Sequence, residues 1–94
     1  VLQNALNNWI SSAATGNQSI SSLRTDYTAK GTSWEKVDLF KDYLDPSTYQ
    51  HFADETSDNT KIKSTALKKT GQYLSLSAWT TTSGSYPKVN INAN

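Results

Sequence analysis

The sequence contains no cysteine and no methionine. Without cysteine, a disulfide framework and a thiolate metal site are both excluded, and nothing in the chain is readily oxidised. Long apolar runs are missing too, since no stretch approaches the roughly 20 residues that a membrane-spanning helix needs. No signal peptide is recognisable either. We therefore expect any membrane anchor or leader to lie upstream of Val1.

Charge is missing from parts of the chain. Residues 1–23 carry no charged side chain, and residues 59–94 carry five lysines and no acid. Residues 34–58 carry seven acids against Lys36 and Lys41. The total of +1 argues against bulk affinity for nucleic acid. Either the acidic and basic segments face each other within one domain, or they are complementary surfaces of neighbouring copies.

The start of the chain has the periodicity of an amphipathic helix. At about 100° per residue, one half of residues 1–13 is apolar and the other half is polar but neutral. Asn and Ser form helices weakly, so tertiary contacts must hold this helix. We expect the lower end of a longer helix that packs or assembles through its apolar residues: Val1, Leu2, Leu6, Trp9 and Ile10.

The middle of the chain predicts short helices, and its end predicts two strands. Three helices are expected after the N-caps Ser19, Ser33 and Asp45, and the one after Ser33 should cover residues 34–44. A fourth helix is expected over residues 61–69, ending at Gly71. Alternating apolar residues predict strands at 72–79 and 87–93, joined by a loop at 80–85.

This order of elements predicts one α+β domain over residues 1–94. A lone hairpin is marginal in water, so its apolar face must lie on another element. The N-terminal helix is the obvious partner. We expect Leu6, Trp9 and Ile10 to pack on the hairpin residues Leu74, Leu76, Val89 and Ile91.

Catalytic, cofactor and metal motifs are not recognisable in the chain. The single histidine, His51, has no nucleophile motif around it, which predicts a solvated side chain and no enzymatic activity. The acidic run at 54–59 is either a solvated loop or a set of oxygen ligands for Ca²⁺; we favour the loop and expect no bound metal or cofactor. Asn17-Gln18-Ser19 matches the N-glycosylation acceptor pattern.

Three segments carry a resemblance to a known family. They are Leu44-Asp45-Pro46-Ser47-Thr48-Tyr49, Thr70-Gly71-Gln72-Tyr73-Leu74-Ser75-Leu76 and Ser85-Tyr86-Pro87-Lys88-Val89-Asn90. With the order of elements, they resemble a bacterial type IV pilin-like protein or type II secretion pseudopilin without its hydrophobic N-terminal half-helix.

The resemblance implies a structural subunit of a filament at the cell surface or in the periplasm. Its partners would be copies of itself or related pilin subunits. A missing N-terminal segment would anchor it in the membrane before assembly, and would be its contact with the membrane. The neutral helix face would continue into the filament core, where unpaired charge is costly.

A different function class fits the aromatic residues of the hairpin. Tyr73, Trp79 and Tyr86 could form an exposed platform that binds carbohydrate or protein, as in a small extracellular binding module. Equally, the middle helices could cover Tyr73 and Trp79, which is the interpretation we favour. A hydrolase that uses His51 is a third, less supported interpretation.

Overall fold

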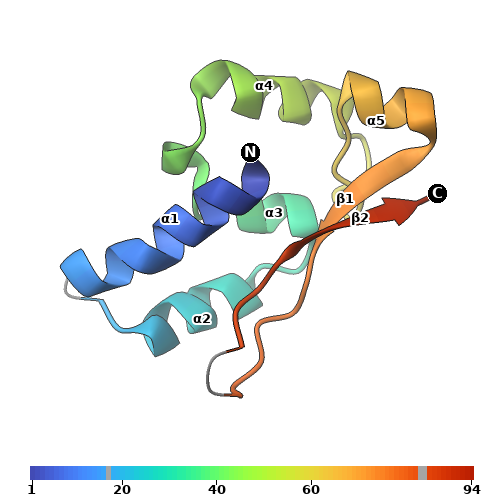
Figure 1. The fold of residues 1–94 in the computed structure, drawn as a ribbon. Helices are drawn as coiled ribbons and strands as arrows, with labels where there is room; N and C mark the ends of the chain where they lie inside the picture. Colours follow the sequence, from blue (N-terminus) through green and yellow to red (C-terminus); the bar gives the residue numbers. More distant parts are fainter. Residues whose placement is uncertain (17, 83–84) are drawn as a thin grey trace.

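The computed structural model describes residues 1–16, 18–82 and 85–94, and all statements below concern these residues. An N-terminal helix and several short helices precede a two-stranded antiparallel sheet, which confirms the α+β class (Figure 1). Asn17 of the glycosylation pattern and residues 83–84 of the predicted 80–85 loop lie outside the described residues. In the described chain, no helix is both long and apolar enough to cross a membrane. The elements are α1 (Leu2–Thr15), α2 (Ile20–Ala29), α3 (Ser33–Val37), the 3₁₀ helix η1 (Lys41–Tyr43), α4 (Pro46–Glu55), α5 (Thr65–Thr70), β1 (Gln72–Leu76) and β2 (Val89–Ala93).

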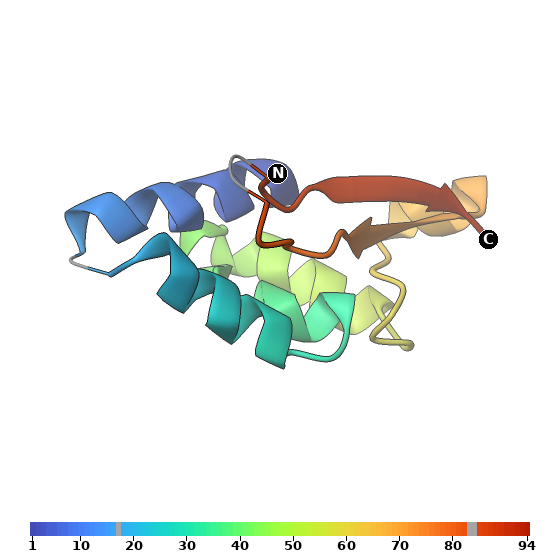
Figure 2. The ribbon, with the colours of Figure 1, turned by 90° about the horizontal axis from the view of Figure 1, so that it is seen from below.

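Helix α1 buries its apolar half inside the domain. Its buried side chains recur at the three- and four-residue spacing of one helix face, as the sequence predicts: Leu2, Ala5, Leu6, Trp9, Ile10 and Ala13. This face lies against α2 and η1, which flank α1 in Figures 1 and 2. Tertiary packing thus stabilises a helix whose other half consists of weak helix formers.

Four aromatic rings form the centre of the core around Trp9. Its ring centroid lies 6.4 Å from that of Tyr27, 6.1 Å from Phe40 and 6.2 Å from Trp79. Tyr27 and Trp79 also meet edge to face, with centroids 5.7 Å apart. These side chains come from α1, from α2, from the turn before η1 and from the segment after β1. The cluster therefore joins the helical half of the domain to the hairpin.

The predicted helix over residues 34–44 is wrong, because the structure divides it into α3 and η1. Val37 and Phe40 are both fully buried, and a turn with Phe40 at φ −126° separates the two short helices. This turn lets Phe40 reach Trp9. Ser33 is not the N-cap; Thr32 caps α3, and the Ser33 hydroxyl accepts a hydrogen bond from the Leu76 amide at 3.0 Å.

The other helices begin close to their predicted caps. Ser19 caps α2, and Asp45 caps α4 with Pro46 in the first turn. Helix α5 is shorter than predicted, because Ile62 forms an antiparallel bridge with Leu74 and the helix begins only after Ser64. It ends at Gly71, whose φ of 69° is the left-handed conformation that favours glycine.

The two strands pair in one register, with Leu74 opposite Ile91 and Leu76 opposite Val89. Leu76 is buried, whereas Ile91 is 65% exposed, so the prediction that Ile91 packs on the first helix is wrong. In Figure 2, the end of the hairpin nearest the C-terminus extends past α1. The helix meets β2 through a polar contact instead, in which the Val89 amide donates to Gln3 Oε1 at 2.8 Å.

Removing the hydroxyl of buried Tyr27 tests how the hairpin is held. Tyr27 Oη donates to the carbonyl oxygen of Ser77 at 2.6 Å, just beyond β1. Tyr27→Phe leaves that carbonyl without this partner, so we expect a loss of about 1–2 kcal/mol in unfolding free energy. Urea unfolding followed by tryptophan fluorescence measures it.

Tyr43→Phe is the matched control for this substitution. Tyr43 is 43% exposed, so the same change there should alter the unfolding free energy by less than about 0.5 kcal/mol. Equal losses in the two variants would contradict a structural role for the Tyr27–Ser77 hydrogen bond.

Candidate functional site

The exposed half of α1 forms an uncharged surface along the whole helix. Asn4, Asn8, Ser11 and Thr15 recur at the four- and three-residue spacing of one outward line, and all are exposed. We call these four residues the neutral ridge. No charged residue belongs to α1, so neither flank of the ridge carries an ion from this helix. Such a surface can be covered by another molecule without desolvating a charge.

The five residues expected to form a packing or assembly face divide into two groups. Val1 is 75% exposed, but the other four lie in the core of this domain: Leu2, Leu6, Trp9 and Ile10. Their apolar surface is therefore used within one chain. The polar side of α1, which includes the neutral ridge, is therefore the surface that this helix offers to another copy.

The three aromatic residues predicted as a platform do not lie together on the surface. Trp79 is 6% exposed and belongs to the core cluster, so it cannot serve as an open stacking surface. Tyr73 is partly buried, with the Lys61 ammonium 5.2 Å from its ring centroid. Tyr86 is 50% exposed and lies 6.1 Å from Trp79, ring to ring. Of the predicted platform, Tyr86 alone presents a ring to solvent.

Tyr86 instead borders two shallow hollows beside α1. One, of about 340 Å³, is lined by Asn7, Ile10, Ser11 and Tyr86. The other, of about 360 Å³, is lined by Gln3, Asn7, Tyr86, Pro87 and Lys88. Gln3 Nε2 donates to Asn7 Oδ1 at 2.9 Å, which orders the amides at their edge. The sequence did not predict that Gln3 and Asn7 lie beside Tyr86. Their four-residue spacing predicts that they contact each other on one helix face, but it does not indicate a third residue.

His51 has a structural partner. It lies exposed on α4, as predicted, and its Nε2 accepts a hydrogen bond from the Thr65 amide at 3.2 Å. Thr65 is the first residue of α5, where backbone amides have no partner within the helix. The Thr65 hydroxyl donates to Glu55 at 3.4 Å. His51 and Glu55 thus hold the end of α4 against the beginning of α5.

The acidic residues weighed as calcium ligands each engage a separate partner. Gln50 donates to Asp54 at 2.8 Å, and Asp58 accepts from the amide and hydroxyl of Thr60 at 2.9 and 2.7 Å. Glu55 pairs with Lys68 at 3.5 Å. Helix α4 continues to Glu55, so part of the predicted acidic loop is helical. No group of three or more metal-binding side chains occurs among the described residues.

One pair supports the interpretation that the acidic and basic segments face each other within one domain. Lys68 belongs to the basic segment and Glu55 to the acidic segment, and their side chains meet. It is the one salt bridge within residues 1–16, 18–82 and 85–94. Most carboxylates of residues 34–58 therefore remain exposed and unpaired with lysine in the described chain.

Comparisons with protein-family models, with curated proteins and with solved structures found no match.

Reversing Lys68 tests whether its charge acts within the domain. Lys68→Glu replaces the pair with two repelling carboxylates. We expect the unfolding free energy to fall by roughly 1 kcal/mol or less, because the pair is partly exposed. Lys69→Glu makes the same charge change at an exposed neighbour and should lower the unfolding free energy by a smaller amount. The difference, measured by urea unfolding, should shrink in 1 M salt. Identical stabilities at low salt would show that the pair contributes nothing.

Tyr49 predicts a dependence of stability on alkaline pH. Its hydroxyl donates to Asp38 at 2.6 Å, and this hydrogen bond, together with burial, raises the pKa of Tyr49 to about 12. The unfolded value is about 10, so this stabilisation is complete below pH 10 and is lost as the pH rises toward 12. Tyr49→Phe should show a shallower fall in unfolding free energy over this range than the parent chain.

Denaturant unfolding at a series of alkaline pH values measures this fall. Burial also raises the pKa of Tyr27, which contributes to the fall in both proteins. The assignment fails if Tyr49→Phe keeps the slope of the parent chain.

Proposed function

We propose that this domain is a structural subunit of a bacterial surface or periplasmic filament, of the type IV pilus or type II secretion class that its sequence resembles. Its task is mechanical and not catalytic. Neighbouring copies, or related pilin subunits, pack against the neutral ridge of α1.

The carrying observation is that an exposed helix face fourteen residues long has no charge. Burying an unpaired ion at an interface costs several kcal/mol, whereas amides and hydroxyls can form hydrogen bonds with a neighbour. The ridge residues contribute little to the fold, since Asn and Ser are weak helix formers. If neighbouring subunits cover this surface during assembly, the ridge residues are uncharged because they become buried in an interface.

Tyr86 favours a second candidate function. Its exposed ring beside the ordered amides of Gln3 and Asn7 combines an aromatic surface with hydrogen-bonding groups, as carbohydrate-binding sites do. The two surfaces meet at Ser11, which belongs to the neutral ridge and also lines the hollow of about 340 Å³ beside Tyr86. Asn8 lies on the neutral ridge and does not line the hollows beside Tyr86.

A charge placed on the ridge separates these functions. In cells that produce the full-length protein, Asn8→Lys should lower the assembled, sedimentable fraction at least about tenfold, because an unpaired ammonium would be buried at the interface. A binding module would tolerate this change. Immunoblotting of the sheared, sedimented fraction and of total cell protein measures assembly against production.

Asn90→Lys is the matched control, with the same substitution at an exposed residue of β2. Asn90 lies outside the neutral ridge and does not line the hollows beside Tyr86, so this lysine should leave assembly unchanged. Because the chain lacks cysteine, Asn8→Cys provides a second readout, and bis-maleimide treatment should join copies through this position. The proposal is overturned if Asn8→Lys assembles normally, or if the parent protein never enters an assembled fraction.

A further inference from the structure

A groove beside α2 carries two cations that form no salt bridge in the part of the chain that the structure describes. Its larger hollow, of about 650 Å³, lies between α2 and the segment after β1, with Arg24, Thr28, Trp79 and Thr80 among its lining residues. A smaller hollow of about 120 Å³ adjoins it at Thr28 and Trp79 and reaches Lys36. We call the two together the α2 groove. It is open and shallow, which suits a protein surface better than an enclosed small molecule.

The two cations of the groove differ in setting, but neither forms a salt bridge within the described residues. Arg24, the one arginine of the chain, forms no ion pair within the part of the chain that the structure describes. The Lys36 ammonium lies 5.1 Å from the ring centroid of Tyr27 and donates to the carbonyl oxygen of Lys30. Burial lowers the pKa of Lys36 although the charge of Glu35 opposes this shift, so a further carboxylate nearby would stabilise the charged form. Asp26 is the acid on α2, and it does not line the groove.

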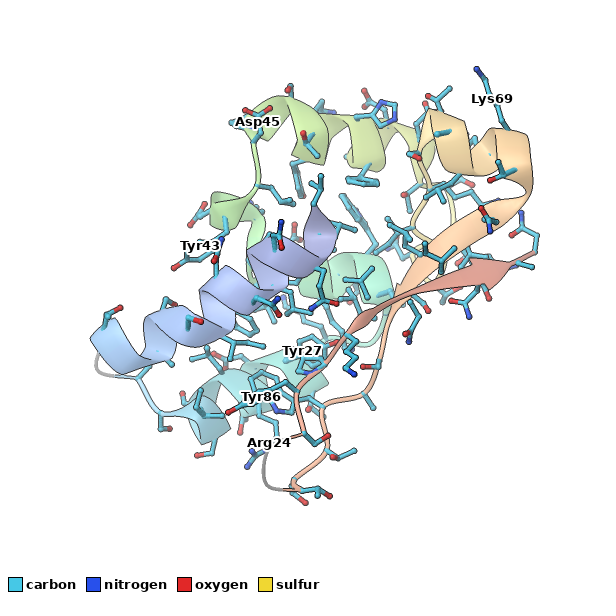
Figure 3. All side chains as sticks on the ribbon, in the orientation of Figure 1. Arg24, Tyr27, Tyr43, Asp45, Lys69 and Tyr86 are labelled. Atoms are coloured by element: carbon cyan, nitrogen blue, oxygen red, sulfur yellow. The ribbon has the colours of Figure 1, made fainter. Side chains whose placement is uncertain are left out.

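A complementary surface lies elsewhere on the same molecule. The turn around η1 and the start of α4 carry Asp38, Asp42 and Asp45 against Lys41. Tyr43 projects there with 43% exposure. Figure 3 places Tyr43 and Asp45 at the upper left of the molecule, well separated from Arg24 at its lower end. We call Asp42 and Tyr43 the acidic corner.

The residues of this surface differ in the contacts that they already make. Asp38 accepts from Tyr49, and Asp45 caps α4 through the Ser47 amide. Asp42 and Tyr43 are exposed and make no side-chain hydrogen bond or ion pair to the rest of the described chain. They are available to another molecule at no cost to the fold.

We propose that the α2 groove receives the acidic corner of a second copy, so that subunits join head to tail. Arg24 binds the Asp42 carboxylate, and the Tyr43 ring enters the larger hollow beside the exposed residues Thr28 and Thr80. An aromatic residue beside an arginine–carboxylate pair is a typical energetic centre of an interface. This inference rests on the proposed function and specifies which surfaces meet.

The chemistry of the two surfaces favours a second copy over other occupants. The charges that lack partners on one surface are opposite in sign to those on the other, and both surfaces belong to one chain. Because the two surfaces are different and lie apart, each copy still offers a free groove and a free corner after pairing. Such a heterologous contact continues into an open filament unless its rotation happens to close a ring.

Cysteine pairs test the head-to-tail geometry directly. In producing cells, full-length protein carrying both Thr25→Cys in the groove and Lys41→Cys beside Asp42 keeps the Arg24–Asp42 pair, and it should give a ladder of multimers with a short bis-maleimide. Co-expressed single variants should give heterodimers and no ladder. A symmetric contact would stop at dimers even in the double variant. Dimers alone, or no cross-linking, would overturn the inference.

Exchanging the two charges tests the pairing of Arg24 with Asp42 independently of cross-linking. Arg24→Glu and Asp42→Lys should each lower the assembled fraction about tenfold, and their combination should restore most of it. Lys69→Glu and Asp54→Lys make the same charge changes outside both surfaces and should assemble normally. Failure of the combination to restore assembly would contradict the pairing of Arg24 with Asp42.

The Asn8→Cys readout keeps the two proposals distinguishable. If Asn8→Cys copies cross-link but the Thr25/Lys41 double cysteine variant gives no ladder, the filament stands and the head-to-tail contact fails. If neither cross-links and no assembled fraction forms, the filament itself fails. Thermal unfolding of the purified domain checks that each variant is folded.

Discussion

The packing of Trp9 is the contact on which the rest of this fold depends. Its ring touches Tyr27, Phe40 and Trp79, which belong to three segments far apart in the sequence. Helices this short are not stable alone, and neither is a two-stranded hairpin. The aromatic cluster lets each of them bury its apolar face against the others. In a chain with few apolar residues, large rings supply the buried area that stability requires.

Polar contacts then fix how these segments lie on the cluster. Tyr27 binds the Ser77 carbonyl, Ser33 binds the Leu76 amide and Gln3 binds the Val89 amide. Each joins a helix, or the residue that begins one, to the backbone of the hairpin. Hydrogen bonds to backbone groups set direction and register, which the non-directional hydrophobic effect cannot do. Three side-chain hydrogen bonds from the helical segments therefore fix the position of the hairpin, together with the packing of Leu74, Leu76 and Val89 on the core.

The surface left over by this packing carries the proposed function. The core takes up the apolar half of α1, so the neutral ridge is what the helix offers to other molecules. Lys68 and Glu55 neutralise each other locally, while Arg24 and Asp42 lie at separated sites without a partner in the described chain. An uncharged ridge suits close packing, and two separated charged surfaces suit a directional contact. A filament subunit needs both kinds of contact.

Local rules in the sequence determined the α+β class, the course of α1, the caps of α2 and α4 and the glycine that ends α5. Each depends on residues within a few positions of one another. Only the tertiary structure decided that Ser33 binds β1 and not its own helix, that the helix predicted over 34–44 breaks at Phe40, and that Trp79 lies inside while Ile91 lies outside. Those outcomes depend on partners 30 or more residues away in most cases, and periodicity carries no information about which distant ring will fill a given space.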